Sequence, residues 1–186
     1  MFVDIEKEIP DILIDVVYAT ERNFVGKAVY PIAKCFLRAK VAGKLKRVQL
    51  RLKSRGLGLK IFDGYRPLSV QKIFWSLVPD DRYVAPPDKG SKHNRGAAVD
   101  VTLVDLEGRE LLMPSLFDEL NHTAHRDFME CSEAAILHRS ILEEAMKEEG
   151  FIPLPTEWWH FDDADWESYP IEDISLESLE SSLYDG

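Results

Sequence analysis

The stretch SKHNRGAAVD, residues 91–100, carries residues that could bind a metal ion. His93 and Asp100 stand seven positions apart, and Gly96 between them allows the chain to turn sharply. Asp100 falls within an apolar, alternating segment, residues 97–106, which is typical of a strand. A buried carboxylate is costly unless a cation or strong donors accompany it. The pattern alone leaves two interpretations open: a metal site, or an aspartate satisfied by a nearby arginine or by backbone amides.

A second cluster lies in EWWHF, residues 157–161, where a glutamate and a histidine are set among aromatic residues. His160 could be a core histidine bonded to a carbonyl group, or it could be a metal ligand with Glu157 as a base. In a regular strand the two side chains would face opposite sides. If both serve one site, the chain must bend near Trp158, or Glu157 must precede the strand. The remaining histidines of the five are interpreted as surface residues: His122, His125 and His138.

Together the two clusters offer a ligand set suited to hydrolytic zinc. His93, Asp100 and His160 would supply two nitrogens and one oxygen, and catalytic zinc sites keep a fourth position for water. Zinc lowers the pKa of such a water toward ~7. A carboxylate outside the ligand set then takes the proton and passes it to the leaving amine. In this interpretation the chain would hold one zinc ion, with Glu157 as the natural candidate for the general base.

Four motifs, in this order along the chain, carry a resemblance to a known family. They are YATERNFVG at 18–26, DGYRP at 63–67, SKHNRGAAVDVTL at 91–103 and EWWHF at 157–161. The chain resembles the VanX-type D-alanyl-D-alanine dipeptidases, a family of zinc D,D-peptidases, over roughly residues 10–162. The resemblance implies zinc-dependent hydrolysis of the D-alanyl-D-alanine dipeptide. It also implies that His93, Asp100 and His160 bind the zinc ion and that Glu157 is the general base.

The same resemblance implies roles for three further residues. Arg66, in DGYRP, matches the arginine that steadies the oxyanion, a role that suits a permanently charged, planar fork. Ser91 matches a residue that helps hold the terminal carboxylate of the substrate, and Tyr18 matches the lining of the cavity. Each has a purely structural alternative. Arg66 could form a local, partly exposed pair with Asp63, Ser91 could cap a turn, and Tyr18 could be an ordinary half-buried tyrosine.

One departure from the family pattern leaves the substrate range open. The family places an acid a few residues beyond its FD pair to receive the substrate amine, whereas this chain has Asn121 near that place, after Asp118 and Glu119. A D,D- or L,D-carboxypeptidase acting on longer peptidoglycan stem peptides is therefore an alternative. A zinc-binding but inactive interaction module, as in hedgehog-type signalling domains, is another. The presence of Glu157 and Arg66 argues against this last class.

Helical and alternating segments are mixed without a strict β-α-β order. This favours an α+β fold with a central antiparallel sheet flanked by helices, like that of hedgehog domains and D,D-peptidases. Ser132 is a capping residue and Gly150 a terminator for the clearest helix. The expected helices are 31–54, 68–77 and 132–149, and the expected extended segments are 57–63, 97–106 and 151–161.

Charge is unevenly distributed along the chain. The net charge is −10, but residues 162–186 hold nine acidic residues and no Lys or Arg, which leaves 24 acidic against 23 basic residues elsewhere. A near-neutral body argues against nucleic-acid binding, which needs a basic face. No apolar run of about 18 residues occurs, so we expect no membrane span. We expect a small D-amino-acid dipeptide as the binding partner.

The two ends of the chain suggest location and assembly. The first 20 residues lack the basic start and unbroken apolar stretch of a signal peptide, which favours the cytoplasm, or the periplasm if a leader was removed. We divide the chain into a zinc D,D-dipeptidase domain, 1–162, and an acidic tail, 163–186. The tail is expected to be mobile or loosely docked. Alternatively, its leucines could form a short amphipathic helix that docks on the body or on a second subunit of a homo-oligomer.

Overall fold

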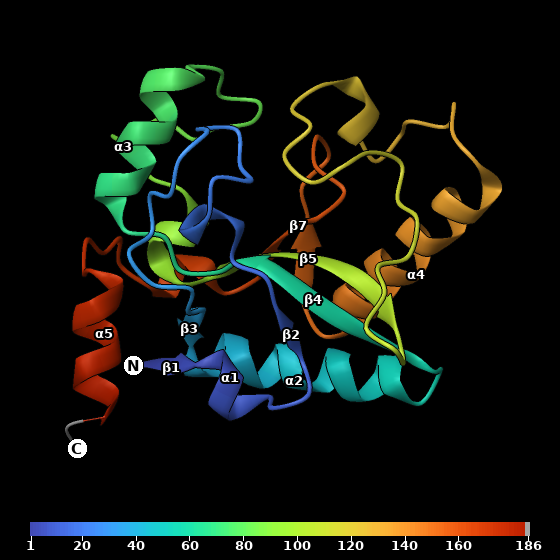
Figure 1. Ribbon diagram of the computed structural model, residues 1–186, viewed down its shortest axis with the longest axis horizontal. Coiled ribbons are helices and arrows are strands. Elements are labelled where there is room, and N and C mark those ends of the chain that lie inside the picture. The colour runs from blue at the N-terminus through green and yellow to red at the C-terminus, as the bar shows by residue number, and fades with distance from the viewer. Residues whose placement is uncertain (185–186) are drawn as a thin grey trace.

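A five-stranded sheet forms the centre of the molecule, and the predicted α+β class is confirmed (Figure 1). The computed structural model describes residues 1–184. Across the sheet the strands run in the order β2 (Leu13–Ile14), β4 (Leu57–Asp63), β5 (Ala98–Asp105), β7 (His160–Asp163) and β6 (Phe151–Pro153). Neighbouring strands are antiparallel except β2 and β4, which are parallel. The expected antiparallel arrangement is therefore confirmed for the central strands and departs only at this edge, where residues 15–56 form a long crossover back to the same end.

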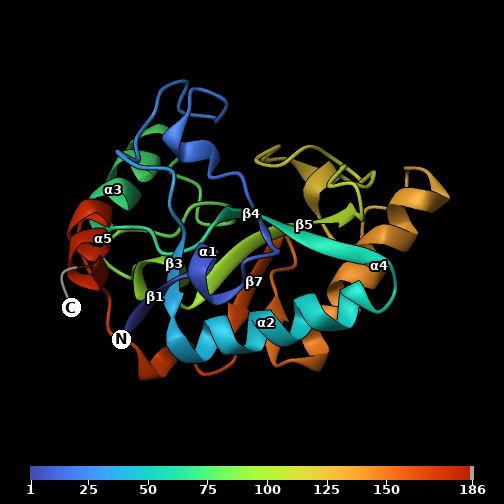
Figure 2. The same cartoon turned by 60° about the horizontal axis from the view of Figure 1, so that its bottom comes forward.

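Helices and loops cover different faces of this sheet. Figure 2 shows α2 (Ala39–Lys53) below the strands, α4 (Glu133–Glu148) running from beside their right-hand ends down to the same side, and mainly loops above them. Alternation along β5 sends Val99, Val101 and Leu103 to one face, and all three are fully buried. Ala98, Asp100 and Thr102 occupy the opposite face, which is the side that carries the candidate site.

The predicted helix 31–54 is wrong in its first third. Residues Phe36–Arg38 form strand β3, which pairs antiparallel with β1 (Phe2–Asp4), and α2 begins only at Ala39. The apolar residues of this segment do recur at helical spacing, but pairing with a distant strand buries them instead. At its far end the chain turns at Gly56 with φ +75°, as expected for a glycine that stops a helix.

The other predicted elements agree well with the structure. Helix α3 spans Leu68–Leu77, and the Ser132 side chain caps α4 by accepting from the Ala135 amide. The expected extended segment 151–161 is divided in two: β6 is the edge strand, and β7 starts at His160 inside the sheet. The short remaining elements are α1 (Ile5–Glu8) and the 3-10 turns η1 (Val17–Ala19), η2 (Lys92–Arg95), η3 (His122–Ala124) and η4 (Trp166–Ser168).

The acidic C-terminal segment is bound to the body of the molecule. Helix α5 (Leu176–Tyr184) lies beside β1 in Figures 1 and 2, with Leu176 and Leu179 buried in the core. The expectation of a mobile or loosely docked tail is therefore wrong for 163–184, and the docked amphipathic helix is the alternative observed. Residues 185–186 lie outside the described part, and the division at residue 162 stays a prediction. Within residues 1–184, no helix combines the length and apolar character needed to cross a membrane.

Candidate metal centre

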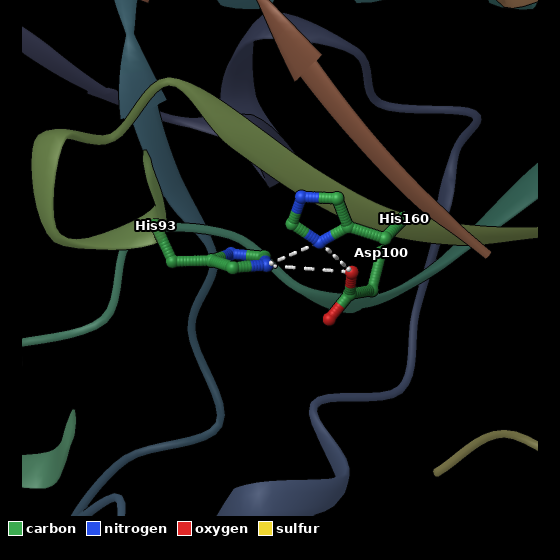
Figure 3. A group of neighbouring side chains, drawn as sticks. All are labelled: His93, Asp100 and His160. Carbon is green, nitrogen blue, oxygen red and sulfur yellow. Dashed lines mark hydrogen bonds and ion pairs between the residues drawn. The ribbon is translucent and has the colours of Figure 1, made fainter. Parts of the chain in front are cut away.

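Three side chains from separate elements point toward one another in Figure 3. His93 lies in η2, Asp100 lies in the middle of β5, and His160 is the first residue of β7, directly opposite Asp100 in the ladder. His93 Nε2 lies 3.1 Å from His160 Nδ1 and 3.3 Å from Asp100 Oδ1, and the remaining pair is 3.0 Å apart. All three residues are buried. The structure thus brings together the three residues that the sequence singled out as potential ligands.

The outer nitrogen of each ring has a hydrogen-bond acceptor. His93 Nδ1 lies 2.7 Å from the Gly64 carbonyl oxygen, and His160 Nε2 lies 2.8 Å from Asp162 Oδ1. A neutral imidazole that donates from its outer nitrogen presents a lone pair from its inner one. Two nitrogen lone pairs and a carboxylate oxygen then face a single point. These three electron-rich atoms repel one another unless a cation or a proton lies among them.

The neighbouring charges determine the protonation of His160 and Asp100. Burial disfavours the charged form of His160, but the Asp162 and Asp100 carboxylates outweigh it and raise the pKa of that imidazole to about 10. Burial also opposes the ionisation of Asp100, yet His93 and His160 hold the pKa of that carboxyl below its ordinary value. The site therefore favours a positive charge at its centre, which a divalent cation would supply in place of the proton.

The spacing of the three atoms fits zinc. Imidazole nitrogens and carboxylate oxygens bind zinc at roughly 2.0–2.2 Å in a tetrahedral arrangement, which places the donors roughly 3.3 Å from one another. The observed separations run from 3.0 to 3.3 Å. Two nitrogens and one oxygen also match the donor set of catalytic rather than structural zinc sites. These residues therefore fit the metal without any rearrangement of the backbone.

Glu157 lies in the turn before β7 rather than in the strand. Its Oε2 atom is 3.8 Å from His160 Nδ1, and only 6% of the residue is exposed. Burial raises the pKa of Glu157 to about 8, and the nearby Asp100 carboxylate adds to the rise. The Trp158 amide donates to the Ala124 carbonyl at 2.9 Å, which helps to hold this turn. Of the two arrangements considered from the sequence, the glutamate preceding the strand is the one observed.

Arg66 forms a buried ion pair with Asp63. Its Nε and Nη2 atoms lie 3.1 and 2.7 Å from Asp63 Oδ2, and Nη1 lies 2.8 Å from Gln71 Oε1. The guanidinium carbon is 4.6 Å from the centre of the Phe74 ring. The pair is local, as expected, but the expectation that it would be partly exposed is wrong, since both side chains are buried. These bonds occupy three of the five N–H groups of the fork and leave two for another acceptor.

The cluster of His93, Asp100 and His160 opens into a small cavity of about 130 Å³, which Arg66, Glu157, Ser91 and Tyr18 also line. Ser91 caps η2, since its Oγ accepts from the His93 amide at 3.2 Å. The capping role considered from the sequence is therefore real, and it coexists with a place in the cavity wall. Tyr18 is almost completely buried, at 2% exposure. All seven residues singled out from the sequence thus border one cavity.

Asp118 also lines this cavity, and it was not selected from the sequence. The Tyr18 hydroxyl donates to Asp118 Oδ2 at 2.8 Å, and burial raises the pKa of that carboxyl well above its ordinary value. Asn121, where the sequence suggested a departure from the family pattern, instead caps η3. Asp118 could have been identified from the sequence as the acidic residue of the FD pair itself, Phe117-Asp118. Its backbone φ of 60° is unusual for a residue other than glycine.

The model of the D-ala-D-ala dipeptidase family of M15 peptidases matches residues 1–176. The chain belongs to this family of metallopeptidases. Two of the relatives of this chain are named D-alanyl-D-alanine dipeptidase. The one from Escherichia coli K12 is 37% identical over 169 residues, covering 91% of this chain and 88% of its own. The one from Enterococcus faecalis V583 is 33% identical over 180 residues, covering 84% and 87%.

A solved structure with lower similarity is the zinc complex of VanY, a D,D-pentapeptidase from a VanB-type resistance cassette. Its sequence is 16% identical, its TM-score is 0.45, and the match covers 72% of this chain and 75% of VanY.

Proposed function

We propose that this chain hydrolyses the D-alanyl-D-alanine dipeptide to two D-alanines, with one zinc ion held by His93, Asp100 and His160. The observation that carries the proposal is the convergence of two imidazole nitrogens and a carboxylate oxygen, 3.0–3.3 Å apart, beside a buried glutamate. When bound there, zinc would lower the pKa of a water molecule toward ~7 and polarise the scissile carbonyl. Membership of the dipeptidase family, together with relatives of that name, supports the choice of substrate.

Glu157 is proposed to move the proton in this reaction. A carboxylate near the ligands can take a proton from the attacking water and return it to the nitrogen of the leaving D-alanine. Burial favours the neutral form of this carboxyl, whereas a bound zinc ion would favour its ionised form, so the group can both accept and release the proton. Its Oε2 atom, 3.8 Å from His160 Nδ1, lies close enough to the ligand cluster for this transfer.

Arg66 is proposed to stabilise the charge that develops on the carbonyl oxygen. The fork is fixed by Asp63 and Gln71, so it needs no reorganisation when the charge appears. Its remaining N–H groups are available to the oxygen. Because guanidinium stays charged at every relevant pH, its contribution does not depend on protonation.

The other cavity residues are proposed to hold the two ends of the dipeptide. Asp118, which accepts from the Tyr18 hydroxyl, would receive the substrate ammonium. An arriving cation would favour the ionised form of this carboxyl, which burial disfavours. Ser91 would bind the terminal carboxylate at the other end. A cavity of about 130 Å³ suits a dipeptide better than a peptidoglycan stem.

The direct test compares D-alanine release from D-Ala-D-Ala with release from a stem pentapeptide that ends in D-Ala-D-Ala. We expect the zinc-loaded protein to prefer the dipeptide, and Glu157→Gln to lower kcat by about 10²–10⁴ without loss of zinc. Faster hydrolysis of the pentapeptide would replace the proposal by a carboxypeptidase. Bound zinc with no hydrolysis of either peptide would leave only an interaction module.

Three finer points belong to the same proposal. A single ligand cluster was found within residues 1–184, which supports one zinc ion per chain. Cys35 and Cys131 are free thiols, as is usual in a reducing compartment, and this supports the cytoplasm. Assembly into a homo-oligomer stays a prediction, for which the measured molar mass in solution is the test.

A further inference from the structure

Asp162 lies next to the metal-binding cluster, yet the proposed reaction assigns it no role. It follows His160 by two positions on β7, and side chains two apart on a strand share a face. Its Oδ1 atom is therefore placed 2.8 Å from His160 Nε2, the nitrogen on the far side of the ring from the cluster. Asp162 is itself 8% exposed. A short, buried contact of this kind can fix the orientation of the imidazole.

The two histidines of the cluster differ in what holds them. His93 donates from its outer nitrogen to a neutral acceptor, the Gly64 carbonyl, at 2.7 Å. His160 donates to a carboxylate. A charged acceptor makes the stronger hydrogen bond, and it increases the electron density that the inner nitrogen can give to a metal. The Asp63 carboxylate lies 3.8 Å from His93 Nδ1, beyond hydrogen-bonding distance, so only His160 has a carboxylate as a direct hydrogen-bond partner.

The Asp162 carboxylate is itself held in place. Its strand is internal, and Asp162 faces Ala98 of β5 on one side and Ile152 of β6 on the other. Its second oxygen, Oδ2, lies 3.6 Å from the Nζ atom of Lys92, which also lies 5.2 Å from the centre of the Trp166 ring. With one oxygen on the ring and the other facing an ammonium, the carboxylate is kept outside the ligand set.

We propose that Asp162 is a positioning residue, which orients His160 so that Nδ1 binds the metal and which increases the affinity of the site for zinc. The inference rests on the proposed zinc site and deepens it. The spacing His-x-Asp at 160–162 would have indicated it in the sequence, because a strand places these two side chains side by side.

The test measures zinc affinity without substrate, by competition with a chromophoric chelator. Removing a partner of a metal-binding histidine typically weakens binding 10–100-fold. We expect a loss of about this size for Asp162→Ala and a smaller loss for Asp162→Asn, whose amide oxygen can still accept from His160 Nε2. The matched control is Asp165→Asn, since that carboxylate is exposed and contacts Lys44 instead of the site. The control should bind zinc like the wild type.

Two additional readouts separate positioning from general damage. Cobalt substituted for zinc should show shifted visible absorption bands in Asp162→Ala and unchanged bands in Asp165→Asn, because the bands report the ligand geometry directly. Thermal unfolding of the metal-free proteins identifies any variant that has lost its fold. If Asp162→Ala is such a variant, the zinc affinity and cobalt bands of Asp162→Asn, which preserves the shape of the side chain, test the positioning role instead. Wild-type zinc affinity and wild-type cobalt bands in a folded Asp162→Ala would overturn the inference.

Failure of the proposed function would be recognised separately. If the wild type binds zinc but hydrolyses no dipeptide, the catalytic proposal fails, and the affinity difference between Asp162→Ala and Asp165→Asn still supports the positioning role. If the wild type binds no zinc at all, both proposals are overturned.

Discussion

The two halves of the candidate site are built in different ways. Asp100 and His160, the strand half, face each other across β5 and β7, both of which are internal strands. Arg66 and His93, the loop half, lie on segments 64–67 and 91–96, which belong to no strand. The Arg66 amide donates to the His93 carbonyl at 3.1 Å, and this bond joins the two segments directly.

Asn94 and the C-terminal segment complete the loop half. The Asn94 side chain donates to the Arg66 carbonyl at 2.8 Å and accepts from the Ser91 amide at 2.7 Å. The Glu172 amide donates to the Asn94 carbonyl at 2.8 Å, and the Leu68 amide donates to the Glu172 carbonyl at 3.2 Å. The regular ladder therefore fixes the backbone of the strand half, whereas the backbone of the loop half depends on a few individual groups. Substitutions in the loop half should disturb stability and activity together.

The largest effect is expected for Arg66→Ala. Removing the guanidinium leaves Asp63 buried without its ion-pair partner, which typically costs about 3–5 kcal/mol of stability. Loss of a group that stabilises the oxyanion should lower kcat by about 10²–10³ in addition. Urea denaturation and D-alanine release measure the two effects. The double variant Asp63→Asn/Arg66→Ala should regain stability but no activity, and if it regains neither, the ion pair does not explain the loss.

A somewhat smaller effect is expected for Asn94→Ala. The Ser91 amide and the Arg66 carbonyl would lose their partners, and each unsatisfied buried group costs about 1–3 kcal/mol. The free energy of unfolding should therefore fall by about 2–6 kcal/mol. Hydrogen exchange should speed up at 91–96 and stay slow in β5 and β7. Equal acceleration in both places would show that the two halves are not independent.

A pH-dependent effect is expected for Asp118→Asn in the metal-free protein. Burial raises the pKa of Asp118 in the folded state above its ordinary value of 3.8. Between pH 3.8 and this raised pKa, the folded state therefore binds more protons than the unfolded state. The wild type must then lose stability relative to Asp118→Asn as the pH rises through this window. Below pH about 3.8 the free energies of unfolding of the two proteins should change with pH in parallel. Parallel stability curves across the whole pH range would contradict the raised pKa.

The smallest effect, with the opposite sign, is expected in the strand half. Thr102 lies two residues after Asp100 on β5, and its buried Oγ1 has no hydrogen-bond partner among residues 1–184. Thr102→Val removes that unsatisfied hydroxyl at nearly constant volume. We expect stability to be unchanged or increased by about 1 kcal/mol or less, with normal kcat. A loss of more than about 2 kcal/mol would mean that the hydroxyl has a partner, such as a buried water.

The same contrast explains which parts of the molecule were predictable from the sequence. Alternation along β5 placed Asp100 on the correct face, and Ser132 with Gly150 marked the ends of α4, because these signals are local. The first third of the helix expected from Pro31 was wrong, because pairing of 36–38 with the first strand is a long-range effect that overrides helical spacing.

Contacts between distant segments were the hardest to predict. The high density of acidic residues suggested a mobile tail, although Leu176 and Leu179 are buried and Glu172 reaches Arg38 and Asn94. The three-residue spacing of Asp63 and Arg66 indicated a pair but not its burial. Asp118 belongs to no periodic segment, so only the folded loop could reveal its contact with Tyr18.

Binding of zinc by the purified, metal-stripped chain tests the central claim most directly. Calorimetric titration should give about one tight site per chain in the wild type, and no tight site in His93→Ala or in Asp100→Asn. Replacing one residue from each half of the site makes the test independent of how either half is built. Wild-type affinity and stoichiometry in both variants would contradict the account, because the metal would then bind elsewhere.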